Sequence, residues 1–79
     1  MSIELSEIKN NNEFLYQVVR ANVGGGTLTL ANVITRCKSR EIPNEKIIEA
    51  FRTEFISRES EAEANKDLSI VKQALEKSA

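Results

Sequence analysis

The residues that interrupt helices stand at only two places in this chain. All three glycines form the run Gly24-Gly25-Gly26, and the only proline is Pro43. Each glycine disfavours a helix by about 1 kcal/mol relative to alanine, and proline is tolerated in a helix only in the first turn. Residues 44–78 contain neither residue type. The breaks therefore divide the chain into segments of helical length and leave a long helical region at the C-terminal end.

The segment before the glycines has the spacing of an amphipathic helix. We expect this helix over about 13–22, with the short amide side chain of Asn12 as its N-cap and residues 1–12 loosely ordered ahead of it. Its apolar residues are Phe14, Leu15, Val18 and Val19. β-Branched residues flank the glycines on both sides, so a β-hairpin within residues 15–37 remains an alternative interpretation.

Two more helices are expected, one on each side of Pro43. The first covers about 28–40 and is capped by Thr27 or Thr29. Its apolar stripe has the spacing i, i+3, i+4, i+7 and consists of Leu30, Val33, Ile34 and Cys37. The second begins at residue 43 or 44, because proline disfavours helix in the residue that precedes it. Its apolar stripe consists of Ile47, Ile48, Phe51 and Phe55.

The C-terminal region carries a further apolar stripe that does not share a face with the one before it. At about 100° per residue, Leu68, Val71 and Leu75 lie roughly opposite the stripe that ends near Ala62. Two arrangements follow. Either the chain forms helices over about 44–63 and 67–78, with a break near Asn65-Lys66-Asp67, or it forms one continuous helix whose far end needs a partner.

Composition indicates a single small all-α domain. The chain has 79 residues, of which 41% are hydrophobic and 29% charged, as in globular rather than disordered proteins. Cys37 is the only cysteine, so no disulfide can stabilise the chain from within. We expect a three- to four-helix bundle over residues 1–79. A domain of this size has a small core, and self-association is one way to stabilise it.

The lone cysteine also predicts a reducing, cytoplasmic setting. Residues 1–5 lack the basic and apolar regions of a secretory signal, and the longest apolar run, Phe14-Leu15-Tyr16, is far shorter than a membrane span. We therefore expect no membrane partner.

No pattern suited to catalysis stands in the sequence. The chain has no histidine, which is the commonest general base and metal ligand. The glycines before Thr27 lack the lysine that a phosphate-binding loop requires. Cys37 belongs to an apolar stripe, where a thiol behaves as a small core residue. We expect a protein that is not an enzyme and that holds no metal or cofactor.

A basic middle region supports one binding hypothesis. Residues 20–58 carry seven basic and four acidic side chains, whereas both ends of the chain are acidic. Two helices joined at Ile42-Pro43-Asn44 within residues 27–55 resemble a helix-turn-helix. Glu45 and Glu49 on the second helix oppose this interpretation, since carboxylates repel phosphates. The candidate nucleic-acid contacts are Arg36, Lys38, Arg40, Asn44, Lys46 and Arg52.

The stripe of Leu68, Val71 and Leu75 supports the hypothesis that we favour. An exposed stripe of this kind is unusual on a monomer and suits a partner helix or a second copy of the chain. The alternative is that these residues pack within the chain's own bundle. We expect a small non-catalytic regulatory or adaptor protein that acts by protein–protein interaction and self-associates through its C-terminal helix. A helix-turn-helix DNA-binding regulator is the alternative.

Overall fold

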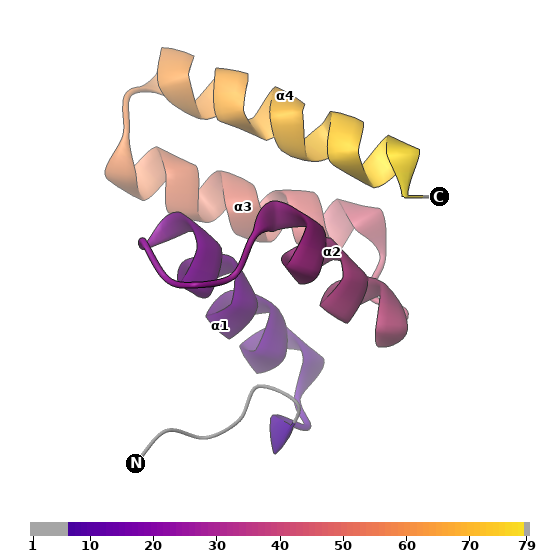
Figure 1. Ribbon diagram of the computed structural model, residues 1–79. Helices are drawn as coiled ribbons and strands as arrows, with labels where there is room; N and C mark the ends of the chain where they lie inside the picture. The colour runs from indigo at the N-terminus through magenta and orange to yellow at the C-terminus, as the bar shows by residue number, and fades with distance from the viewer. Residues whose placement is uncertain (1–6, 79) are drawn as a thin grey trace.

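A computed structural model describes residues 7–78, and these residues form four α-helices (Figure 1). The helices are α1 (Asn11–Val23), α2 (Leu30–Ser39), α3 (Asn44–Arg58) and α4 (Glu61–Lys77). No strand occurs within residues 7–78, so the predicted all-α fold is confirmed and the β-hairpin interpretation is wrong. Of the stretch expected to be loosely ordered, residues 1–6 lie outside the described part, and Asn11 and Asn12 belong to α1.

The bundle is arranged around α3. Both α1 and α4 pack on α3, and α2 packs on α1 and α4. Figure 1 shows α4 running antiparallel to α3, with α1 on the other side of α3 from α4. All four helices contribute to one apolar core, which consists of Phe14, Leu15, Val18, Val19, Val33, Ile34, Cys37, Ile42, Ile47, Phe51, Phe55, Ala64, Leu68, Val71 and Leu75.

Side-chain caps fix where the first two helices begin. The Asn10 side chain accepts a hydrogen bond from the Glu13 N–H at 3.0 Å, so α1 starts two residues before the predicted 13. Each of three consecutive asparagines can cap a helix, which is why spacing alone did not identify the right one. Thr29, one of the two expected caps, accepts from the Asn32 N–H at 3.2 Å.

The glycine run provides the backbone freedom that the connection from α1 to α2 requires. Gly25 has a φ of +84°, which side chains rarely adopt. A Cβ at Gly26 would collide with the backbone carbonyl of Ala21, so only glycine allows the chain to pass this close to α1.

The break between the last two helices lies at Glu59-Ser60, which corrects the expected position near Asn65-Lys66-Asp67. Ser60 Oγ accepts a hydrogen bond from the Glu63 N–H at 3.3 Å and caps α4. The alternative of two separate helices is therefore confirmed, with bounds 44–58 and 61–77 in place of the expected 44–63 and 67–78, and the continuous helix is wrong. Ser60 and Glu63 have the spacing of a capping box, a start signal that is easily overlooked within a run of good helix formers.

A second turn, at the C-terminal end of α2, joins α2 to α3. Glu41 N–H donates to the Lys38 carbonyl at 2.9 Å, and Ile42 N–H donates to the Cys37 carbonyl at 3.1 Å. These two bonds form a Schellman motif, in which the residue that takes the left-handed conformation is usually glycine. Here Glu41 occupies that position with a φ of +58°. The motif ends α2 and places Ile42 in the core.

Replacing Glu41 with glycine should stabilise the protein. The left-handed conformation costs a non-glycine residue about 1–2 kcal/mol, and the greater freedom of glycine in the unfolded chain offsets part of the gain. We expect Glu41→Gly to raise the free energy of unfolding by about 0.5–1 kcal/mol in urea denaturation. Glu41→Ala is the control, because alanine keeps the Cβ. An equal gain from Glu41→Ala would show that relief of strain is not the cause.

Candidate interaction surface

The predicted partner stripe on α4 lies inside the bundle. Leu68 is 7% exposed, Val71 2% and Leu75 1%. The reversal at Ser60 explains this placement: two stripes that are opposed along one helix face each other once α4 folds back on α3. The expectation that these three side chains offer a surface to a partner is therefore corrected, because the chain's own core already covers them.

This placement predicts a large loss of stability from truncation of the stripe. Leu75→Ala should lower the free energy of unfolding by about 2–5 kcal/mol, the range found for large-to-small substitutions in cores. Ile70→Ala on the same helix removes a side chain that is 52% exposed, so we expect a change within about 0.5 kcal/mol. Urea denaturation of both variants measures the difference. Equal, small effects would contradict the buried position of Leu75.

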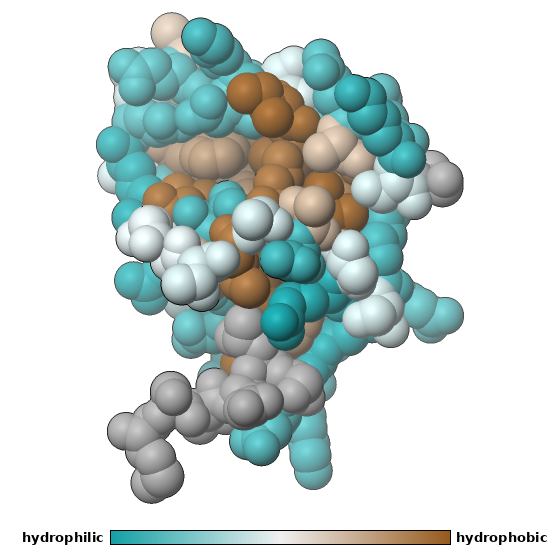
Figure 2. Space-filling model, viewed as in Figure 1, coloured by the Kyte–Doolittle hydropathy of each residue, from teal (hydrophilic) through white to brown (hydrophobic). Residues whose placement is uncertain are grey.

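Three large apolar side chains stay exposed among the described residues. Tyr16 on α1 is 49% exposed, Ile56 on α3 58% and Ile70 on α4 52%. Figure 2 shows apolar surface in the middle of the visible face, bordered by hydrophilic side chains. The sequence analysis did not single out Ile56 or Ile70. Ile56 directly follows a stripe residue and Ile70 directly precedes one, but neither belongs to a stripe. An apolar residue that falls outside the helical pattern was the available signal.

Ile56 belongs to a hollow between the C-terminal half of α3 and the first turns of α4. The hollow has a volume of about 200 Å³. Its apolar part is formed by Ile56, Ala64 and Leu68, and its polar lining by Arg52, Glu59, Glu61 and Asn65. Leu68 and Ala64 are buried, so Ile56 is the apolar wall of the hollow that reaches the surface.

Glu59 gives the hollow an unusual electrostatic character. Its Oε1 atom is buried without a hydrogen-bond partner. The pKa of Glu59 is raised above its usual range, first by a side-chain hydrogen bond with Asp67 and then by burial and by the charges of Asp67 and Glu63. Two carboxyl groups that lie this close resist being ionised together.

A second acidic side chain, Glu54, is buried on the other side of α3. Arg20 Nε lies 3.5 Å from Glu54 Oε1, and Arg58 Nε lies 3.8 Å from Oε2. The attraction is ionic, since Oε1 makes no hydrogen bond. Arg20 also lies over the ring of Tyr16, and its Nη1 donates to the Tyr16 hydroxyl at 3.2 Å. Glu54 therefore ties α1 to α3 through exposed arginines.

Removing both arginines should cost more than removing the buried acid. We expect the double substitution Arg20→Gln and Arg58→Gln to lower the free energy of unfolding by about 1–3 kcal/mol, because it leaves the Glu54 carboxylate buried without a partner. Glu54→Leu leaves both arginines in contact with water and should change stability by less than about 1 kcal/mol. Thermal unfolding compares the two variants. A larger loss for Glu54→Leu would contradict this account.

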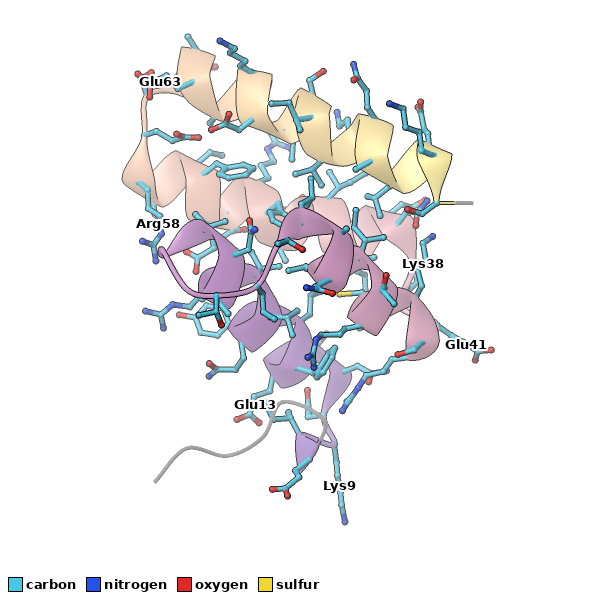
Figure 3. The ribbon with its side chains drawn as sticks, in the orientation of Figure 1. Lys9, Glu13, Lys38, Glu41, Arg58 and Glu63 are labelled. Carbon is cyan, nitrogen blue, oxygen red and sulfur yellow. The ribbon has the colours of Figure 1, made fainter. Side chains whose placement is uncertain are left out.

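The structure brings two of the six candidate nucleic-acid contacts together and places Arg52 at the hollow. The Lys38 ammonium donates to the Asn44 side-chain oxygen, so these two residues do meet at the start of α3. Arg40 lies over the Phe14 ring, 3.7 Å from its centroid, and Arg52 lines the hollow beside α4. Arg36 and Lys46 are exposed on α2 and α3. Figure 3 shows Lys38 and Glu41 at the opposite end of α3 from Arg58.

The helix pair also lacks helix-turn-helix packing. α2 and α3 are joined by the short turn at Glu41, yet α2 packs on α1 and α4 rather than closely on α3. In a helix-turn-helix unit the first helix supports the reading helix directly. α3 is instead held between α1 and α4.

Within residues 7–78 no group of three or more histidine, cysteine or acidic side chains is placed to hold a metal ion. Cys37 is fully buried, and burial raises the pKa of its thiol to about 11 despite the opposing charge of Arg40. A thiol with this pKa is a poor nucleophile. No helix in the described part of the chain is long and apolar enough to cross a membrane.

Comparison with known proteins gives no match to a family model, a curated protein or a solved structure.

Proposed function

We propose that this chain is a small non-catalytic adaptor or regulatory protein that acts by protein–protein interaction, and that the hollow between α3 and α4 is its contact surface. The observation that carries the proposal is Ile56, which is 58% exposed beside the apolar floor of Ala64 and Leu68. Apolar anchors that enter small pockets with polar rims are the usual centres of protein interfaces.

The occupant of the hollow is either another protein or a second copy of the chain. Self-association through Leu68, Val71 and Leu75 would require α4 to leave α3, since these side chains are buried. Self-association through Ile56 leaves the bundle intact. The lone, buried Cys37 suits a reducing cytoplasmic setting for either form of the proposal.

The proposal predicts that an acidic residue at Ile56 abolishes association and leaves the fold intact. Ile56→Asp places a charge in the apolar part of the hollow, and burial of an unpaired charge against a partner is strongly unfavourable. Two measurements test this: the solution mass by light scattering, and the set of proteins retained by the immobilised chain from its native host. We expect Ile56→Asp to lose either the oligomer or the specific retained protein.

Ile70→Asp is the matched control, because Ile70 is exposed to a similar extent on α4 and does not line the hollow. It should associate like the wild type. Circular dichroism confirms that both variants keep their helices. The proposal would be contradicted if the wild type is a strict monomer and if the wild type and Ile56→Asp retain the same proteins. Retention of DNA fragments that weakens steeply with salt would instead support nucleic-acid binding.

A further inference from the structure

The hollow between α3 and α4 has a basic end and an acidic end. Because α4 runs antiparallel to α3, the hollow starts at the connection between the two helices and extends back along both of them (Figure 1). Glu61, the first residue of α4, lines it at the connection. Arg52 lines it further back on α3, about 9 Å before the end of that helix at 1.5 Å per residue. Ile56 lies between the two ends, one helical turn from Arg52.

Neither end of the hollow is neutralised within the described part of the chain. Among residues 7–78, Arg52 pairs with no carboxylate and Glu61 pairs with no basic group. Glu59, which lines the acidic end together with Glu61, is hydrogen-bonded to another acid, Asp67. Arg52 and Glu61 are both exposed, so their charges remain available to a group outside the chain.

A surface with one basic and one acidic end is complementary to itself. A two-fold axis perpendicular to α3 beside Ile56 reverses the direction of the hollow in one copy of the chain relative to the other. The basic end of each copy then faces the acidic end of its partner, and the contact occurs twice, as in every two-fold interface. A partner protein with a uniformly charged surface would instead be repelled at one of the two ends.

The size of the hollow limits its occupant to about one side chain. Pockets for drug-sized ligands have volumes of roughly 300–1,000 Å³. The hollow, at about 200 Å³, is smaller. Ile56 supplies a side chain of suitable kind, because it is apolar, 58% exposed and placed at the wall of the hollow.

We propose that the hollow receives Ile56 of a second copy of the chain, so that the protein forms a two-fold symmetric dimer. The inference rests on the proposed function and narrows it to self-association. Ile56 of each copy lies against Ile56 and Ala64 of the other, and Arg52 of each copy meets Glu61 of the other. The bundle does not rearrange, and Leu68, Val71 and Leu75 stay in the core of their own chain.

Exchange of charge between the two ends tests this arrangement. Arg52→Glu gives a hollow with two acidic ends, and Glu61→Arg gives a hollow with two basic ends. Each variant alone should dimerise about ten-fold more weakly than the wild type, because both symmetric contacts become repulsive. Sedimentation equilibrium at low salt, over chain concentrations up to about 1 mM, measures the dissociation constant.

A mixture of the two variants should restore the dimer. In a mixed dimer the acidic end at residue 52 of one chain faces the basic end at residue 61 of the other, and the second contact joins the native Arg52 and Glu61. The double variant Arg52→Glu and Glu61→Arg should also dimerise like the wild type, since its two ends are exchanged but still opposite in charge.

Glu76→Arg is the matched control. It changes the net charge as much as Glu61→Arg does, at an exposed acid on α4 that does not line the hollow. It should dimerise like the wild type. Circular dichroism of each variant confirms that its helices are kept.

A wild type that is monomeric at about 1 mM would overturn the inference, and so would a mixture that dimerises no better than the separate variants. These results are separable from the test of the proposed function. If the wild type is monomeric but Ile56→Asp loses a specific retained protein, the hollow binds another protein and the proposed function stands. If Ile56→Asp changes neither the solution mass nor the retained proteins, the proposed function fails and the inference fails with it.

Discussion

The fold depends on one reversal of the chain, at Ser60. Its hydroxyl accepts the Glu63 N–H and starts a new helix directly after α3 has ended. As a result, the apolar stripe of α4 meets the apolar side of α3 instead of facing solvent. Without this turn the two helices would form one rod with stripes on opposite sides, and the rod would need a partner for its far end. The reversal makes the core complete within a single chain.

The same reversal creates the hollow. Because only two residues separate α3 from α4, the last turns of α3 and the first turns of α4 lie side by side, and their acidic side chains come together at the connection. Glu59 is placed beside Asp67, and Ile56 stays outside the core. One local capping interaction therefore determines both what the chain buries and which side chains it leaves exposed at the hollow.

Helical spacing predicted most of the fold from the sequence. It identified the stripes of α1, α2 and α3, and the start of α3 after Pro43. It did not identify the last break, because a run such as Glu59-Ser60-Glu61-Ala62 has high helix propensity whether or not a cap interrupts it. Tertiary packing of α4 on α3 determines where the break falls, and local helix propensity does not report tertiary packing. The sequence alone therefore did not determine whether Leu68, Val71 and Leu75 pack in the core or contact a partner.

The candidate surface was harder to predict than the core. Ile56 and Ile70 carry no periodic signal, and the charge that matters at Glu59 comes from a neighbour, Asp67, eight positions away across the connection. The turn at Glu41 shows a related limit. The usual signal for that turn is glycine, and with Glu41 at that position nothing in the sequence indicated the Schellman motif that the chain forms.

The central claim is that the α4 stripe packs on α3 within the same chain. Nuclear Overhauser contacts from the Leu68, Val71 and Leu75 methyl groups to α3 side chains test it directly, in a sample that mixes isotope-labelled and unlabelled chains. Contacts that appear only within labelled chains are the result that the account predicts. Contacts from these methyl groups to unlabelled chains, without contacts inside the chain, would contradict it.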